Sequence, residues 1–332
     1  MKRKILFYIF ILSLIFSSIL FLSINNKYIR HDNSSPDLQD SQPETIPKNI
    51  VYGGDDLPSE IITLTEDSSV QTDLRDEDLR ISGPVNEVPW EDDMDFLNTL
   101  DQNGTHTLLA AFRTVLKDPL PGEEFNVHLA ARLLKGTIVK PLEIFSQNIA
   151  IGPYIQSRGY RKGPTYIGSN LTTTYGGGVC KISSTLYNVA VLSNLQVIER
   201  HAHSMPVPYV PYGQDATVAY GAKDFKFKNT SESPILIWAL GVENTLYIAL
   251  YGNYTPPKIE WEHEIIRTYK APVIYKINNE LPSGEEKIIL EGMDGAVVRS
   301  WINIQEENGA ATVKQMGTSY YTPMSHIIEK GK

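Results

Sequence analysis

The first thirty residues contain the longest apolar run of the chain. Ile5–Ile24 has only Ser and Tyr as polar residues and follows Lys2, Arg3 and Lys4. A helix rises about 1.5 Å per residue, so a run of this length crosses the hydrocarbon core of a bilayer. No small-residue cleavage signal follows it, which favours an uncleaved signal anchor over residues 1–30. The basic start predicts a cytoplasmic N-terminus and a single-pass protein of the cell membrane whose C-terminal part is extracytoplasmic.

Residues 31–104 form an acidic segment that is rich in Asp, Glu, Ser and Pro. A segment of this composition buries little apolar surface, so we interpret it as a low-complexity spacer between the membrane and a folded part. Two apolar pieces interrupt it: Ile61–Leu64, and Trp90 together with Phe96 and Leu97. Each piece is a candidate for a short element that docks against the main domain.

From residue 105 onward the apolar positions have the spacing of a globular domain. Leu108–Val115 is predicted to be one buried element. Asn126–Lys135 has apolar residues three and four positions apart, which predicts a short amphipathic helix. A second helical period begins directly behind the loop Tyr175–Gly178, so Cys180 is predicted to lie at a helix start.

Short β-rich runs separated by Gly, Pro, Asn and Asp follow this helix, at residues 196–201, 216–220, 225–228, 235–240 and 245–251. With the helices they predict an α+β fold over residues 105–252, in which a helix behind a Gly-rich loop packs on a mainly antiparallel sheet. Further β-rich runs predict a C-terminal extension over residues 256–332, with strands at 265–269, 273–277, 287–290, 296–304 and 312–315.

Composition limits the partners and the chemistry. The formal net charge is -9, and nucleic-acid affinity comes mostly from Lys and Arg contacts, so nucleic acid is not an expected partner. Cys180 is the single cysteine, so the chain has no internal disulfide. An unpaired thiol in an exported chain is either a small buried hydrophobe or a reactive group.

The residues around Cys180 favour a reactive thiol. Gly176, Gly177 and Gly178 permit positive φ angles and are expected to leave open space through which a substrate reaches the sulfur. The N–H groups and dipole at a helix start stabilise a thiolate and lower the pKa of the thiol. The same N–H groups can stabilise an oxyanion during acyl transfer.

Two serines follow the thiol in the first turn of the helix, where a hydroxyl suits capping better than catalysis. The predicted substrate-binding surface comprises Gly176, Gly177, Gly178, Lys181, Ser183, Ser184 and Asp224.

A cysteine nucleophile needs a base, and His201 and His203 are the candidates. If residues 199–204 form a strand, both side chains point to the same face. We assign the base to His203 and expect a structural role for His201, which stays the second candidate. Asp215 and Asp224 are the nearest carboxylates that could orient the imidazole, although both also suit turns, and spacing does not choose between them.

The His-x-His pattern also suits a metal ion. A zinc site would take its third ligand from Cys180, Asp215 or Asp224. Two histidines and one thiol without a second cysteine motif are a weak zinc signal, so we expect no metal and no other cofactor.

Four blocks, in order along the chain, resemble the VanW domain, a family named from an accessory gene of vancomycin-resistance clusters: Tyr175–Asn188, Glu199–Pro206, Asp215–Gly221 and Asp224–Asn229. The stretch from Asn126 to Asn148 is also similar to that family. The resemblance covers about residues 105–252. It implies a bacterial envelope protein that works on peptidoglycan, and some members of the family are L,D-transpeptidases that form 3→3 cross-links through the motif cysteine.

Carried over to this chain, the resemblance makes Cys180 the nucleophile. It would attack the carbonyl of the third residue of a stem peptide, expel the terminal D-residue and pass the acyl group to the side-chain amine of a second stem. His203, or His201, would be the base. The family usually has Gln where this chain has Lys181. A cation there would favour the thiolate, whereas the lost amide would remove an oxyanion or substrate contact.

The C-terminal region, residues 256–332, weakly resembles the G5-like tail found after VanW domains, through Glu291–Gly295 and Tyr320–Pro323. Such a tail would bind or orient glycan; a plain β extension of the main domain is the alternative.

Two functions therefore remain open. One is a cysteine acyltransferase on peptidoglycan stem peptides, and the other is a non-catalytic peptidoglycan-binding or scaffolding protein of the cell envelope. They differ in the reactivity of Cys180, because only the enzyme needs a thiol of low pKa that becomes acylated. The pattern names no protein partner.

Overall fold

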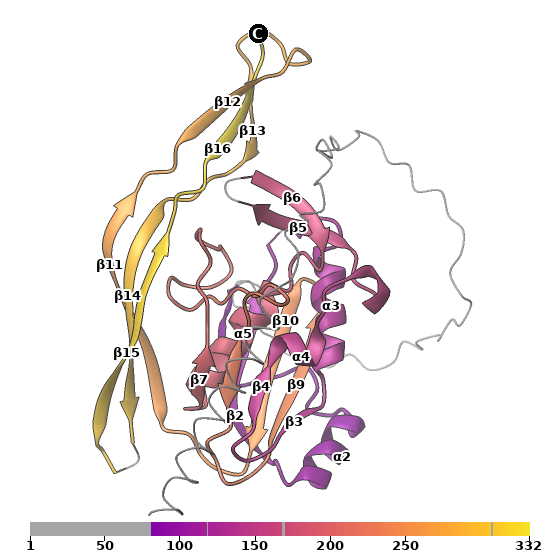
Figure 1. Cartoon of the computed structure of the whole chain (residues 1–332), viewed down its shortest axis with the longest axis vertical. Helices are drawn as coiled ribbons and strands as arrows, with labels where there is room; N and C mark the ends of the chain where they lie inside the picture. The colour runs from indigo at the N-terminus through magenta and orange to yellow at the C-terminus, as the bar shows by residue number, and fades with distance from the viewer. Residues whose placement is uncertain (1–80, 118, 168–169, 307) are drawn as a thin grey trace, which may run out of the picture. The chain divides into compact units, whose positions relative to one another are not determined.

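The computed structural model describes residues 81–117, 119–167, 170–306 and 308–332 (Figure 1). All of them belong to one compact unit. The predicted anchor over residues 1–30 and most of the predicted spacer lie outside the described residues. No helix in the described ranges is both long enough and apolar enough to span a bilayer.

The central element is an antiparallel sheet of five strands in the order β1-β2-β10-β9-β3 (Figure 1). Their bounds are β1 (Gly83–Val85), β2 (Thr107–Val115), β10 (Thr245–Gly252), β9 (Ile235–Val242) and β3 (Thr137–Val139). Strands β9 and β10 are almost continuously apolar because both faces of the sheet are covered. Ile235 and Ile237 belong to the core on one face, whereas Leu236 and Trp238 belong to the core on the other.

The first face carries the two predicted helices, α3 (Glu123–Leu134) and α5 (Cys180–Leu192). In α3 the fully buried apolar residues recur at three and four positions: Val127, Ala130, Ala131 and Leu134. Helix α5 is buried along most of its length, and its buried polar side chains Ser184, Thr185 and Asn188 are hydrogen-bonded to backbone carbonyls. The predicted α+β class, with helices on a mainly antiparallel sheet, is confirmed.

The opposite face is covered by a segment that we had placed in the acidic spacer. Helix α2 (Met94–Asn103) is capped by Asp93 and buries Phe96. Trp90 is also buried, and its indole N–H donates to the hydroxyl of Tyr251 at 3.0 Å. The boundary at residue 104 is therefore wrong for residues 83–103. Two aromatic side chains supply enough apolar area to fix an otherwise polar segment on the sheet.

Smaller elements lie beside α5. A three-stranded sheet has the order β4 (Ile144–Ser146), β8 (Lys226–Lys228), β7 (Gln196–Glu199). A hairpin of β5 (Lys162–Ile167) and β6 (Asn170–Tyr175) leads into the glycine loop. The short helix α4 (Gln147–Ile151) follows β4.

The strand predicted at residues 216–220 is absent from the described elements. Ala216 donates its N–H to the Ser184 hydroxyl at 2.9 Å, and Thr217 donates its N–H to the His201 carbonyl at 2.8 Å. The backbone groups of this segment are therefore used to hold loops and helix α5 rather than a ladder, which period-2 patterning cannot foresee.

The C-terminal region consists of two further sheets (Figure 1). One is antiparallel, with the order β11 (Lys258–Tyr269), β14 (Gly295–Gln305), β15 (Ala311–Tyr321). The other has the order β12 (Val273–Ile277), β16 (His326–Lys330), β13 (Glu286–Leu290), and β12 and β16 are parallel. Each C-terminal run expected from the sequence is a strand. Ile259, Ile302 and Ile304 join the core that contains α5.

Candidate catalytic site

The glycine loop connects β6 to α5 and is tightly packed. Gly176 and Gly178 have φ angles of 76° and 103°. A Cβ on Gly177 would lie 2.2 Å from the carbonyl oxygen of Gly163 in β5. The glycines thus permit two backbone segments to approach closely. They do not provide the open space beside the thiol that we expected. Asn126 of α3 holds the loop by donating to the Gly177 carbonyl at 2.9 Å.

Cys180 is the first residue of α5, as predicted, and its side chain is part-buried. Three hydrogen bonds stabilise this turn: Val179 N–H to Gly176, Lys181 N–H to Gly178 and Ile182 N–H to Val179. None of them uses the N–H of Cys180. The set of free N–H groups that we expected at the helix start is therefore smaller, and within the described part of the chain the Cys180 N–H has no backbone acceptor outside the helix.

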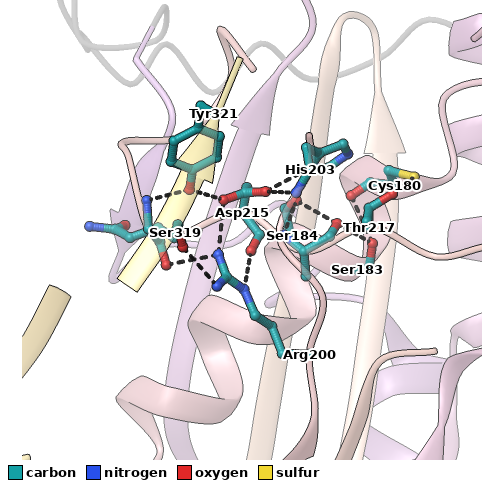
Figure 2. Close-up of polar contacts among 12 residues, drawn as sticks. Cys180, Ser183, Ser184, Arg200, His203, Asp215, Thr217, Ser319 and Tyr321 are labelled. Atoms are coloured by element: carbon teal, nitrogen blue, oxygen red, sulfur yellow. Dashed lines mark hydrogen bonds and ion pairs between the residues drawn. The ribbon is translucent and has the colours of Figure 1, made fainter. Parts of the chain in front are cut away.

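His203 lies between Cys180 and Asp215 (Figure 2). Its Nδ1 is 2.7 Å from the Asp215 Oδ2, and its backbone N–H donates to the same oxygen at 2.7 Å. The hydroxyl of Tyr209 is 3.5 Å from the other ring nitrogen, Nε2. Because the carboxylate holds Nδ1, the imidazole presents Nε2 to its surroundings, as a base paired with a thiol requires.

Asp215 is buried, with 1% of its surface exposed, and its second oxygen is also occupied. Oδ1 accepts from the Arg200 guanidinium at 2.9 Å and from the Tyr321 hydroxyl at 2.5 Å (Figure 2). Burial raises the pKa of this carboxyl, but the hydrogen bond from His203 and the positive charges of Arg200 and His203 lower it further, so the net shift is downward. Asp215 is thus a buried, fully coordinated carboxylate.

The thiol and the imidazole shift each other's pKa. Burial raises the pKa of Cys180, but the nearby His203 with its positive charge and the Thr217 hydroxyl, 3.4 Å from the sulfur, lower it to about 7. Burial lowers the pKa of His203, but Asp215 and Cys180 raise it to about 9. The thiol therefore loses its proton before the imidazolium does, which favours a thiolate–imidazolium pair.

This pair predicts the pH dependence of thiol alkylation. Iodoacetamide reacts with the thiolate, so its rate with Cys180 is expected to rise with pH around a midpoint near 7, below the ordinary value of 9.0. Because Cys180 is the single cysteine, labelling of the intact chain followed by mass spectrometry reports this site alone. The same chain unfolded in urea is the control and should give a midpoint near the ordinary value. A native midpoint that matches the unfolded one would contradict the pair.

The remaining sequence candidates have other partners. His201 is 3.0 Å from a carboxylate oxygen of Glu199. Asp224 accepts from the Ser146 hydroxyl at 2.5 Å and from the Asn148 N–H at 3.0 Å. The structure therefore brings together Cys180, His203 and Asp215. It leaves His201 and Asp224 outside this group, and β7 ends before the two histidines, so they do not form the strand face that we expected.

The same geometry counts against the zinc alternative. That alternative required the two histidines to share one ion. His203 instead has its Nδ1 on Asp215, and His201 has its Nε2 on Glu199. In the described residues, no group of three or more His, Cys, Asp or Glu side chains is suitably placed for a metal.

Lys181 and the two serines do not point a free polar group at the thiol. The Lys181 ammonium pairs with the Glu123 carboxylate and lies 4.7 Å from the ring centre of Tyr209. Its charge is thus matched by Glu123. Ser183 and Ser184 are fully buried and donate to the Ala216 carbonyl at 2.7 Å and 3.1 Å. They tie α5 to the segment that carries Asp215, which replaces the predicted contact with substrate.

Sequence reasoning missed several residues of this site. Arg200 lies inside the block Glu199–Pro206, but its role as a partner of Asp215 has no signature in spacing. Tyr321 is 106 positions away from Asp215 along the chain. Gln147 lies in the stretch from Asn126 to Asn148. Its amide donates to the Val179 carbonyl at 3.4 Å, and its Oε1 is buried without a partner among the described residues.

Comparison with known proteins confirms the sequence resemblance. Residues 122–251 match the family described as VanW like protein. The uncharacterized protein YoaR of Bacillus subtilis (strain 168) is 36% identical over 145 residues, which are 44% of this chain and 48% of YoaR. The vancomycin B-type resistance protein VanW of Enterococcus faecalis (strain ATCC 700802 / V583) is 34% identical over 119 residues, 34% of this chain and 43% of that protein. The match spans less than half the length of either relative.

Two solved structures are similar to part of the chain. The G5 domain of IgA1 protease is 21% identical and covers 24% of this chain and 95% of its own, with a TM-score of 0.16. The HP0197-G5 structure is 14% identical and covers 22% of this chain and 99% of its own, with a TM-score of 0.14. This likeness concerns the fold alone.

Proposed function

We propose that this chain, whose residues 122–251 match the family described as VanW like protein, is a cysteine acyltransferase of the cell envelope, an L,D-transpeptidase that acts on peptidoglycan stem peptides. One observation carries the proposal: His203 lies between Cys180 and Asp215 (Figure 2), and its Nδ1 is 2.7 Å from the Asp215 carboxylate, which is the order of a nucleophile, a base and an orienting carboxylate. The name of one relative, a vancomycin resistance protein, agrees with work at the cell wall.

In the first half-reaction the Cys180 thiolate attacks the carbonyl carbon of the third stem residue. The bond from that carbon to the nitrogen of the terminal D-residue breaks, and the imidazolium of His203 gives its proton to the leaving amine. The product is a thioester on Cys180. Asp215 stays ionised and stabilises the imidazolium while the charge changes.

In the second half-reaction the side-chain amine of another stem peptide attacks the thioester. His203 takes the proton from that amine, and the carbon–sulfur bond breaks to restore the thiolate and form the 3→3 link. If water attacks instead, the product is a trimmed tripeptide. We assign the oxyanion donor for both tetrahedral centres to the N–H of Cys180, for which the described residues show no backbone acceptor at the helix start.

The test is to incubate the full chain, purified in detergent, with disaccharide-tetrapeptides and to analyse the products by mass spectrometry. We expect 3→3 dimers or trimmed tripeptides, and an acyl adduct on the peptide that contains Cys180 after an acid quench. The controls are the iodoacetamide-treated protein and the Cys180→Ala variant, which should give neither. If the untreated wild type also gives neither but still retains muropeptides, the protein is a non-catalytic peptidoglycan-binding protein instead.

A further inference from the structure

A tyrosine from the C-terminal region reaches the carboxylate of the proposed triad (Figure 2). Tyr321 is the last residue of β15 and is 3% exposed. Its hydroxyl donates to the Asp215 Oδ1 at 2.5 Å and accepts the N–H of Gly213 at 2.9 Å. The ring lies 5.3 Å, centre to centre, from that of Tyr212.

This contact belongs to a wider attachment of the same segment. Residues 200–215 carry both His203 and Asp215. At one end of this segment, Arg200 donates to the Ser319 hydroxyl of β15 at 3.1 Å. Four residues further on, the Ser204 carbonyl accepts from the N–H of Thr322 at 2.7 Å and from its hydroxyl at 2.8 Å. Strand β15 and the residue after it thus hold the segment at several points.

The hydroxyl of Tyr321 is one of the groups that fix the rotation of the Asp215 carboxylate. Oδ2 is held by the ring and the backbone N–H of His203, and Oδ1 is held by Arg200 and Tyr321 together. Without the Tyr321 hydroxyl, the Asp215 Oδ1 would accept a side-chain hydrogen bond from Arg200 only. The buried N–H of Gly213 would also lose its acceptor. A buried carboxylate in that state can rotate to satisfy the free donor, which lengthens its bond to the imidazole.

We propose that Tyr321 is a positioning residue for the triad, so that the C-terminal region is part of the site rather than a separate module. The consequence for turnover rests on the proposed function. The consequence for the thiol does not, because it acts through the Asp215–His203 contact and the charge of His203, whether or not the protein turns over a substrate. Tyr321 lies outside residues 122–251, the range that matches the family.

The test compares Tyr321→Phe with Tyr320→Phe in the full chain. Tyr320 is the adjacent residue, 68% exposed, so the control removes the same hydroxyl from the opposite face of β15. The readout is the pH midpoint of Cys180 alkylation by iodoacetamide. Tyr321→Phe is expected to raise the midpoint by at least about half a unit, since a misaligned Asp215 supports the imidazolium less and the imidazolium supports the thiolate less. Tyr320→Phe is expected to leave it unchanged.

An unchanged midpoint in a folded Tyr321→Phe chain, or one that falls, would overturn the proposal. Thermal melting establishes that the variant is folded, and the phenylalanine ring keeps the packing on Tyr212. Ser319→Ala provides a second, milder variant, which frees one arm of Arg200 and should raise the midpoint in the same direction by less. If the wild-type chain shows no turnover but Tyr321→Phe still raises the alkylation midpoint, the transpeptidase function is refuted and the positioning role of Tyr321 is supported.

Discussion

Replacing His203 with alanine is expected to slow the acylation of Cys180 by about 10³-fold, the range that general acid–base catalysis supplies. Two effects combine. The leaving amine loses its proton donor, and the thiol loses the partner that lowers its pKa. Burial then acts on the thiol without opposition from His203, so the pKa of Cys180 should rise above its present value of about 7. Acid-quenched mass spectrometry of the adduct over time measures the rate.

The matched control is His201→Ala. His201 is two positions from His203 along the chain, and its ring contacts the Glu199 carboxylate instead of belonging to the triad. Its removal is expected to leave the acylation rate within about a factor of two of wild type, because surface substitutions away from a site change little. Equal losses in the two variants would contradict the assignment of the base to His203 and reopen the choice between the histidines.

Replacing Asp215 with alanine is expected to lower the free energy of unfolding by about 3–5 kcal/mol, the cost of removing one partner from a buried ion pair. Arg200 would keep a part-buried guanidinium without its carboxylate, and the hydroxyl of Tyr321 would lose its acceptor. Urea denaturation followed by circular dichroism measures the loss. Because this stability comes from a lowered pKa, it is present above the unfolded value of 3.8 and disappears as pH falls through the folded pKa.

Glu264→Ala is the control for this loss. Glu264 is 3.5 Å from Arg299, and both side chains are more than half exposed, so the pair is screened by water. Its removal should change the urea midpoint far less than Asp215→Ala does. Similar midpoints for the two variants would show that Asp215 is not the anchor of a buried network.

The part of the site that follows from local pattern could be predicted from the sequence. Cys180 was placed correctly at a helix start, because a glycine loop followed by a helical period is a local signal. The sequence already favoured His203 over His201, but the choice of Asp215 over Asp224 depends on the loop around Ala216, which is hydrogen-bonded to α5. Asp224 receives its hydrogen bonds at the start of α4, a role that the spacing of acidic residues does not separate from catalysis.

Long-range contacts account for most of what the sequence could not predict. Tyr321 reaches Asp215 across 106 positions. A tyrosine near the end of a strand has the same local pattern whether its hydroxyl meets water or a buried carboxylate. The acidic composition around Trp90 and Phe96 likewise concealed a helix whose stability comes from the sheet it covers rather than from its own propensity.

The pairing of β1 with β2 determines where the protein can be shortened. Gly83–Val85 covers the outer side of β2 opposite Ala111–Arg113. A chain that began at residue 105 would leave β2 as an open edge with unpaired N–H and C=O groups, and it would expose Trp238 and Tyr251 where α2 now lies. Such an edge, beside an apolar face, is a template for aggregation between molecules. A soluble fragment for biochemical work therefore has to start ahead of Gly83.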